Sequence, residues 1–364
     1  MSNTAVISAA GLCAGYGKKI VVDGLSFSVG AGEILTLIGP NGAGKSTVIK
    51  TIAAQLPAVS GNVYIGQMSL RQMNERDVSR HLSLLLTSRL STDKMTCEDV
   101  VSTGRYPYTG RLGILSENDR RIVQDAMELT SVLHLRERDF RHISDGQRQC
   151  VMLARAIAQQ PGIMLLDEPT SFLDISNKLR LLTLLRRLVR EKNIAVIQSL
   201  HELDLAQKFS DRLLCIHGGK AERLGTPEEI FSGGYISRLY GIDTGSYDTL
   251  YGTAEPERIK GEPEVFVIGG GGSGIPVYRS LQRQGIPFAA GVIHENDIDH
   301  PAAEKLASVL ITEAAFEPIS SDTLDRARAV MRKCGRVICC ADTFGTMNMG
   351  NLTLRQEAEA EGKL

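Results

Sequence analysis

The sequence lacks an excess of either charge, a long apolar run and an even set of cysteines. Its 364 residues include 41 Lys and Arg against 42 Asp and Glu, for a formal net charge of −1. This balance offers no electrostatic footprint for a nucleic-acid backbone, so we predict no nucleic-acid partner. No run of about 18 apolar residues occurs, and the N-terminus does not have the pattern of a secretion signal. We therefore expect the chain to be made and kept in the cytosol.

The cysteines number seven and are scattered along the chain. An odd, dispersed set argues against a disulfide framework and fits a reducing compartment. Cys334, Cys339 and Cys340 fall close together, and we interpret them as small buried side chains in preference to metal ligands. Because a single core rarely keeps growing at this chain length, we predict two domains.

What the sequence does contain is a glycine-rich turn at residues 39–47 with the spacing Gly-x-x-x-x-Gly-Lys-Ser/Thr. Glycines in this spacing let backbone N–H groups face phosphates, while the lysine meets the outer phosphates and the hydroxyl ligates Mg²⁺. An apolar run at 34–38 precedes the turn and a helical pattern follows it, so a helix N-terminus points at the anion. The predicted phosphate-binding residues are Gly39, Asn41, Gly42, Gly44, Lys45, Ser46 and Thr47.

The segments around this turn predict an α/β domain. Residues 5–30 alternate short apolar runs with turn residues, which indicates an antiparallel patch. Further strands are expected at 61–65 and 82–86, and the second, apolar throughout, is expected to be central in the sheet. Residues 96–138 show helical stripes broken by glycines and proline, so we predict a helical insertion that stands off the sheet.

Two further segments place polar side chains after apolar strands. Asp167 and Glu168 follow the run at 163–166, and His201 follows the run at 194–197. An isolated acidic pair would often cap the next helix, and a lone histidine is more often structural than catalytic. Because the carboxyl ends of parallel strands form the ligand edge of α/β sheets, the phosphate-binding turn favours a functional role for all three residues.

The stretch from His142 to Gln149, with the helical pattern that follows it, resembles the signature motif of ATP-binding cassette (ABC) ATPases. Together with the phosphate turn, the Asp-Glu pair and His201, the resemblance covers about residues 5–240. It implies a P-loop NTPase fold, with a RecA-like core, an antiparallel β patch and a helical subdomain. Residues 103–108 and the segment 173–175 resemble importer ATPases for iron–siderophore, haem or cobalamin uptake.

The resemblance also implies a role for each matching residue. Tyr16 would stack on the adenine of ATP, and Lys45 would neutralise phosphate charge. Ser46 and Asp167 would hold Mg²⁺, Glu168 would be the general base, and His201 would contact the γ-phosphate. Asp174 resembles the acidic residue that communicates across the dimer.

The signature residues Ser144, Gly146 and Gln147 are implied to act on the nucleotide held by a second copy. In this family the signature closes over the opposite γ-phosphate with backbone N–H groups at a helix N-terminus. Because the chain has one phosphate turn and one signature, the resemblance implies a homodimer with two composite ATP sites.

Two positions depart from the family pattern. Asp145 replaces the usual glycine of the signature, and we expect its side chain to point away from the phosphate. Thr87 falls closest to the position where the family usually has a glutamine that contacts Mg²⁺ or water and couples to the permease. The hydroxyl of Thr87 would still reach the metal through water, although its reach is shorter.

The carboxyl-terminal part predicts a second, smaller Rossmann-like α/β domain at 264–364, after a linker at 241–263. Gly269, Gly271 and Gly274 follow an apolar strand at 265–268, with Glu295, Asp297 and Asp299 near the position of a ribose-binding acid. A ligand-binding role and a purely structural or regulatory role both remain open. A further alternative is that 265–268 is the last strand of the first domain.

The leading functional prediction is an ATPase, using ATP and Mg²⁺, that drives a membrane importer. Its partners would be a second copy, separate integral-membrane permease subunits and, indirectly, a substrate-binding protein. It would therefore lie at the cytoplasmic face of the cell membrane. The alternatives are a soluble ABC-type ATPase that clamps a macromolecule, and a cassette whose extension senses a nucleotide or cofactor.

Overall fold

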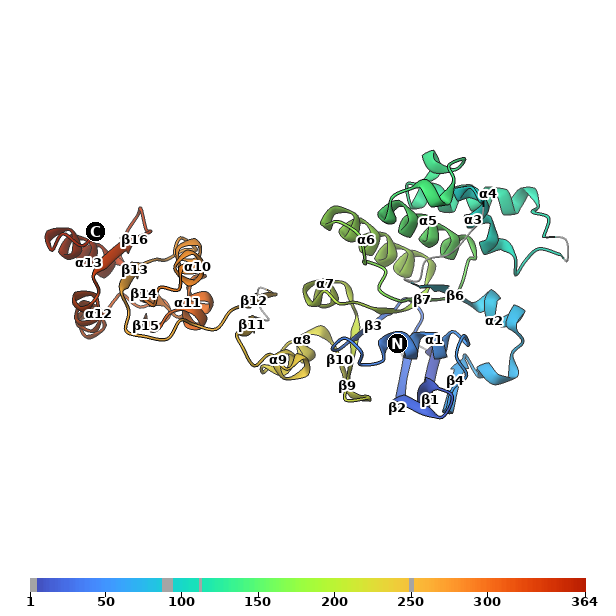
Figure 1. The fold of residues 1–364 in the computed structure, drawn as a ribbon, viewed down its shortest axis with the longest axis horizontal. Coiled ribbons are helices and arrows are strands. Elements are labelled where there is room, and N and C mark those ends of the chain that lie inside the picture. The colour runs from blue at the N-terminus through green and yellow to red at the C-terminus, as the bar shows by residue number, and fades with distance from the viewer. Residues whose placement is uncertain (1–4, 87–93, 111–112, 249–251) are drawn as a thin grey trace. The chain divides into compact units, whose positions relative to one another are not determined.

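The computed structural model describes residues 5–86, 94–110, 113–248 and 252–364. It divides into two compact units, Met1–Tyr240 and Gly241–Leu364 (Figure 1). Thr87, predicted to contact the metal, lies outside the described residues.

The first unit is built on a sheet with the strand order β5-β4-β1-β2-β10-β9-β3-β8-β7-β6 among the described residues. Strands β1, β2, β4 and β5 pair antiparallel, whereas β9, β3, β8, β7 and β6 run parallel. The bounds are β1 Ala5–Tyr16, β2 Lys19–Gly30, β3 Ile34–Ile38, β4 Ser60–Ile65, β5 Met68–Ser69, β6 Leu82–Leu85, β7 Ile163–Leu166, β8 Ala195–Ser199, β9 Arg212–His217 and β10 Lys220–Gly225. The predicted antiparallel patch and parallel core are thus both confirmed.

Strand β6 lies at the end of the sheet, so the prediction of a central strand was wrong. Its side chains are nevertheless largely buried, because helix α5 (Asp145–Ala158) packs against it. Gln159, which follows this helix, donates its side-chain amide to the carbonyl of Leu82 over 2.7 Å. An edge strand covered by a helix needs the same apolar composition as a central one.

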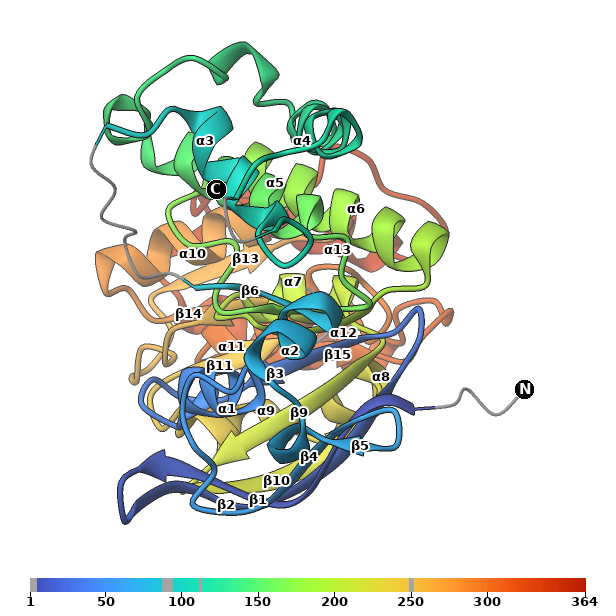
Figure 2. The same cartoon turned by 90° about the vertical axis from the view of Figure 1, so that its right-hand side faces the viewer.

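Helices cover the sheet and form a separate subdomain beside its β6 end. Helices α3 and α4 both pack against α5, and Figures 1 and 2 show all three on the side of the unit farthest from β1 and β2. The remaining bounds are α1 Lys45–Ile52, α2 Glu75–His81, α3 Cys97–Ser102, α4 Glu117–Leu129, α6 Ile175–Lys192, α7 Leu203–Phe209, α8 Pro227–Ile230 and α9 Tyr235–Tyr240.

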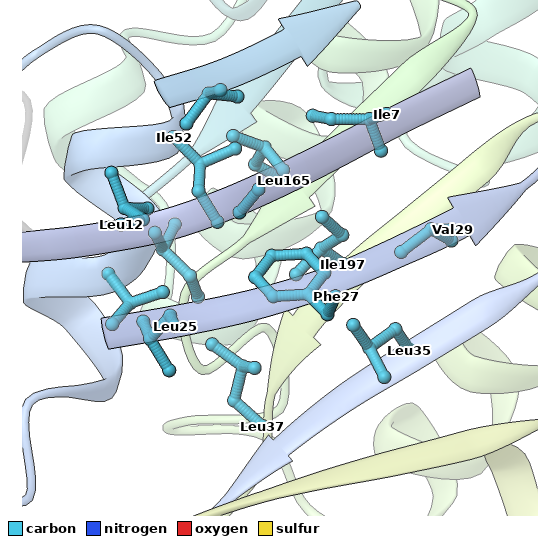
Figure 3. Close-up of a cluster of buried hydrophobic side chains, with 14 of the residues drawn as sticks. Ile7, Leu12, Leu25, Phe27, Val29, Leu35, Leu37, Ile52, Leu165 and Ile197 are labelled. Atoms are coloured by element: carbon cyan, nitrogen blue, oxygen red, sulfur yellow. The ribbon is translucent and has the colours of Figure 1, made fainter. Parts of the chain in front are cut away.

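The main core joins the antiparallel patch to the parallel strands. Buried side chains of β1 and β2, among them Leu12 and Phe27, belong to one cluster with Leu35 and Leu37 of β3 (Figure 3). Ile52 of α1 belongs to the same cluster. Full burial of one such side chain contributes about 1.5–3 kcal/mol. The cluster therefore fixes both β3 and α1, the two elements that flank the phosphate turn.

The second unit contains a four-stranded parallel sheet in the order β15-β14-β13-β16. Alternate residues of β13 enter two different clusters, one with α10 and α11 and the other with α12 and α13. The bounds are β13 Val265–Ile268, α10 Ile275–Gln284, β14 Phe288–His294, α11 His300–Leu306, β15 Val309–Glu313, α12 Ser321–Lys333, β16 Arg336–Cys339 and α13 Met349–Ala360. Since β13 lies in a sheet of its own, it is not the last strand of the first unit.

The segment 241–263 is more than the predicted linker. It contains the antiparallel strands β11 (Ser246–Asp248) and β12 (Thr253–Glu255). The buried Glu255 carboxylate pairs with Arg279 of α10. Gln282 of the same helix donates to the carbonyl of Glu257 over 2.6 Å. The segment therefore packs as part of the second unit.

Candidate functional site

The glycine-rich turn follows the carboxyl end of β3 and leads into α1. Gly39 has a φ of +147°, and a Cβ there would lie 2.1 Å from the carbonyl oxygen of Ile216. Gly44 has a φ of +103°, and a Cβ there would lie 2.3 Å from a methyl group of Val22. Only glycine fits both positions, because other residues would clash in addition to being strained. The tight turn leads directly into the N-terminus of α1, where backbone N–H groups can bind an anion.

Lys45 begins α1 and is 5% exposed. Its ammonium donates to the carbonyl oxygens of Gly39 (2.7 Å) and Pro40 (3.1 Å). Burial lowers the pKa of Lys45, while the nearby carboxylates of Glu168 and Asp167 oppose this shift. A poorly solvated cation held inside the turn is suited to meet a negatively charged group there.

Asp167, at the end of β7, links the phosphate turn to β8. The hydroxyls of Ser46 and Ser199 both donate to its Oδ1, over 2.9 and 2.8 Å. Asp167 is 3% exposed, so its carboxylate is nearly enclosed. A serine hydroxyl and a carboxylate in contact are the hard oxygen ligands that Mg²⁺ prefers. The residues present therefore fit a magnesium ion.

Glu168 follows Asp167 and reaches His201 after β8. Its Oε1 lies at hydrogen-bond distance from Nε2 of His201, and its Oε2 accepts from the Ser171 hydroxyl over 3.1 Å. The backbone of Glu168 has a φ of +50°, and its N–H donates to Ser199 Oγ over 2.9 Å. The side chains of Glu168 and His201 are 26% and 39% exposed. A partly open carboxylate beside an imidazole can accept a proton from water.

The loop that carries His201 is anchored through its neighbour Glu202. The carboxylate of Glu202 pairs with Lys178 of α6 at 2.5 Å and accepts from the Thr170 hydroxyl at 3.0 Å. Burial favours the neutral form of Glu202, but the hydrogen bonds from Lys178 and Thr170 lower its pKa overall. The loops after β7 and β8 are thus tied to each other and to α6.

The signature residues lie at the N-terminus of α5. Ser144 caps the helix by accepting from the Gln147 N–H over 3.2 Å, and Gln147 Oε1 accepts from the Ser144 N–H over 3.1 Å. Asp145 pairs with Arg148 on the same helix. Within the part of the chain that the structure describes, no hydrogen bond joins Ser144, Gly146 or Gln147 to the phosphate turn.

Two further predicted residues lie apart from this constellation. Tyr16 is at the end of β1 with 52% of its surface exposed. Asp174 caps α6 by accepting from the Asn177 N–H over 2.8 Å. The N-cap gives Asp174 a structural function within its own chain, in addition to any role at an interface.

The structure thus brings together Lys45, Ser46, Asp167, Glu168 and His201. Ser199, which joins Asp167 to Glu168 through its hydroxyl, was not among the predicted site residues. Its position at the carboxyl end of β8 is the signal that could have identified it. Gln149 was not predicted either; its amide donates to the carbonyl of Pro169 over 3.0 Å and ties α5 to the loop after Glu168.

The glycine-rich turn of the second unit does not show the ribose-binding arrangement that its spacing predicts. Asp299 Oδ2 accepts from the N–H groups of Gly270 (2.7 Å) and Gly274 (2.8 Å). Asp297 accepts from the Gly271 N–H over 3.0 Å. Two of the three acids near the predicted ribose position, Asp297 and Asp299, therefore bind the turn itself.

Comparison with known proteins identifies the family. A family model described as ABC transporter matches residues 22–171, and one described as the MJ0874 family matches residues 288–364. An uncharacterized ABC transporter ATP-binding protein of Methanocaldococcus jannaschii is 39% identical, covering 77% of this chain and 97% of the relative. The iron(3+)-hydroxamate import ATP-binding protein of Bacillus subtilis is 35% identical, covering 63% of this chain and 85% of the relative. The cobalamin import ATP-binding protein of Halobacterium salinarum is 31% identical, covering 83% and 77%.

Solved structures show the same cassette fold. The structure of an ATP-binding subunit of an ABC transporter is 26% identical with a TM-score of 0.56, covering 68% of this chain and 98% of that chain. A dimeric, post-hydrolysis cassette bound to ADP and Pi is 22% identical with a TM-score of 0.55, covering 61% and 98%. No helix among the described residues has the length and apolar character needed to cross a bilayer. With the site geometry, these matches show that the chain belongs to the ABC transporter family, as one of its ATP-binding ATPase subunits.

Proposed function

We propose that this chain hydrolyses ATP as a homodimer and thereby powers a separate permease for the import of a metal chelate of the iron–siderophore or cobalamin kind. One observation carries the proposal: at the carboxyl edge of the parallel strands, Ser46 contacts Asp167, and the neighbouring Glu168 contacts His201. These groups can hold a nucleotide phosphate, a metal and an attacking water side by side.

The residues of the phosphate turn hold the nucleotide in this proposal. Lys45 would exchange its hydrogen bonds to Gly39 and Pro40 for bonds to the β- and γ-phosphates. Ser46 and Asp167 would hold Mg²⁺, and the ion, when bound, neutralises the charge that develops on the phosphates. Tyr16, exposed at the end of β1, would stack on the adenine.

Glu168 acts as the general base. Its carboxylate, oriented by Ser171 and by the Ser199 bond to its backbone, accepts a proton from the water that attacks the γ-phosphate. His201 would give up its contact with this carboxylate and donate a hydrogen bond to the γ-phosphate oxygens when its Nε2 carries the proton.

Each ATP site is completed by a second copy of the chain. Ser144, Gly146 and Gln147 form an exposed or partly exposed helix start that makes no hydrogen bond to the phosphate turn within the described residues. Backbone N–H groups at a helix N-terminus form an anion site, so this surface suits the γ-phosphate held by the partner. The negative charge of Asp145 is paired with Arg148 on the same helix.

The transport role rests on the relatives. Their names describe import of iron(3+)-hydroxamate and of cobalamin, and transport of ferric enterobactin. We propose corresponding partners for this chain: integral-membrane permease subunits, through which it associates with the cytoplasmic face of the membrane, and indirectly a substrate-binding protein.

Replacement of the base tests the hydrolysis step. We expect Glu168→Gln to lower the rate of phosphate release by about 10²–10⁴-fold, the usual contribution of a positioned general base, with Mg-ATP binding retained. The measurement is phosphate release and equilibrium binding with purified protein. Glu191→Gln, at an exposed position near the end of α6, is the control and should leave both unchanged. Unchanged turnover in Glu168→Gln would show that another group is the base.

A further inference from the structure

The second unit has a cavity at the carboxyl edge of its four-stranded sheet. Its volume is about 440 Å³, within the size range of small-molecule sites. The glycine-rich turn after β13, the end of β14 and the residues that begin α13 line it, with Phe316 and Ile298 among the lining side chains. The sheet-edge part of this lining follows the carboxyl ends of β13 and β14, the edge at which open α/β sheets bind ligands.

The groups that would bind a phosphate in this cavity are already occupied. Asp299, which is fully buried, holds the N–H groups of Gly270 and Gly274 and also that of Ile275 over 3.2 Å. Asp297 holds the N–H of Gly271. A phosphate would have to displace these carboxylates or approach them as a like charge. Either event is unfavourable.

The charge of the lining side chains also argues against a phosphate ligand in this cavity. Among the described residues that line the cavity, none is Lys or Arg, and Asp297 is the acidic member. Phosphate sites normally supply a cation or free backbone N–H groups. The described lining supplies no Lys or Arg, and the N–H groups of Gly270 and Gly271 are already taken by carboxylates, so its electrostatics favour an uncharged or cationic ligand.

Exposed apolar side chains gather at this cavity. Phe316 is 75% exposed, and Ile298 and Met347 are 47% and 41% exposed. Phe316 also has a φ of +62°, a backbone conformation that bulky side chains rarely adopt. Large apolar groups left in water at the wall of a cavity indicate a surface that a ligand covers.

The loop that presents Phe316 is fastened on both sides. Glu313, at the end of β15, accepts from the N–H groups of Ala314 (3.1 Å) and Ser320 (2.8 Å). His294 of β14 lies 2.8 Å from the carbonyl oxygen of Glu317 through its Nε2, and the Ile319 N–H donates to the carbonyl of Met347 over 3.0 Å. These bonds fix the backbone of the loop on both sides of Phe316.

We propose that the second unit binds a planar, phosphate-free ring compound, uncharged or cationic, which stacks on Phe316 in this cavity. Flat rings gain from stacking on an aromatic side chain, and the methionine and isoleucine of the wall supply apolar contact on the other sides. The glycine-rich turn shapes the cavity without binding a phosphate group.

The test compares riboflavin with its phosphate ester, FMN, on the full-length protein. Both carry the same uncharged ring system, and their fluorescence reports binding directly. Excess ADP fills the nucleotide site of the first unit. We expect saturable binding of riboflavin and at least tenfold weaker binding of FMN. Phe316→Leu should weaken riboflavin binding at least fivefold, whereas Phe316→Tyr, which keeps the ring, should retain it.

The first unit provides a matched control in Phe172, which is also 75% exposed and has a φ of +65°. Phe172→Ala should leave riboflavin binding unchanged. The proposal is overturned if riboflavin fails to bind saturably, if FMN binds as well as riboflavin, or if Phe172→Ala and Phe316→Leu weaken binding equally. Circular dichroism of each variant distinguishes a lost contact from a lost fold, and Phe316→Tyr with native binding excludes a general effect of substitution.

Discussion

At the scale of single residues, Ser199 explains how two neighbouring carboxylates keep different orientations. Its hydroxyl donates to Asp167 and accepts from the N–H of Glu168. Asp167 is thereby directed toward Ser46, while Glu168, in a left-handed backbone conformation, turns toward His201. Ser199 acts through Asp167 and Glu168, so we regard it as a positioning residue.

We predict that Ser199→Ala lowers kcat for ATP hydrolysis about tenfold and changes KM little. The substitution leaves the partly buried N–H of Glu168 without its acceptor, which costs about 1 kcal/mol, and it frees the proposed base to leave its position. Steady-state kinetics and chemical denaturation together measure the two effects. An equal loss of kcat and of nucleotide affinity would argue against a positioning role.

Ser83 of β6 is the matched control. It is also buried in a parallel strand, and its hydroxyl has no hydrogen-bond partner among the described residues. Ser83→Ala therefore removes a hydroxyl without orphaning another group, and stability and kcat should both stay within experimental error.

At the scale of elements, the helical subdomain is fastened by one buried ion pair. Arg105, 4% exposed, donates to Asp119 Oδ1 over 2.8 Å and to the carbonyl of Ala158 over 2.8 Å. Its guanidinium lies 4.1 Å from the centre of the Tyr108 ring. Asp119 also closes the capping box of α4 with Ser116, and the hydrogen bond from Ser116 is the main cause of its lowered pKa. The pair joins residues 103–108, α4 and the end of α5.

We predict that Asp119→Ala destabilises the first unit by about 3–5 kcal/mol, because it leaves the Arg105 charge buried and unpaired. Guanidinium denaturation measures the loss. Asp99→Ala is the control, since Asp99 closes the equivalent capping box of α3 at an exposed site. It should cost about 1 kcal/mol, the usual value of a cap. Equal costs for both variants would show that the ion pair adds nothing.

At the scale of the whole molecule, the two units have separate cores and separate sheets. We propose that they also unfold as separate cooperative domains, with the boundary near Tyr240. In our proposal ATP binds only to groups of the first unit. Its binding should therefore raise the free energy of unfolding of the first unit and leave that of the second unit unchanged.

Calorimetry of full-length Glu168→Gln protein tests this expectation. We predict two transitions, of which Mg-ATP at about 100 times its Kd stabilises one by about 2.7 kcal/mol and leaves the other unmoved. Mg²⁺ alone is the control. One transition that shifts as a whole would show that the units unfold together.

Much of the fold and site was predictable from local sequence. The turn at Gly39–Thr47 is specified by the steric demand of its glycines and by the flanking apolar periods. Asp167, Glu168 and His201 were predictable because the carboxyl ends of parallel strands meet at one edge. The edge position of β6 was not, because a buried edge strand has the same composition as a central one.

The sequence by itself determined which residues we propose for the ATP chemistry, because their spacing within short segments dictates the strand, turn and helix of the phosphate turn. Only the tertiary structure decided which side chain binds the backbone groups of each glycine-rich turn. In the first unit the glycine turn is filled by its own Lys45, whereas in the second the turn is closed by Asp299, 25 positions beyond Gly274. Such long-range pairing depends on how strands and helices pack, and spacing along the chain does not encode it.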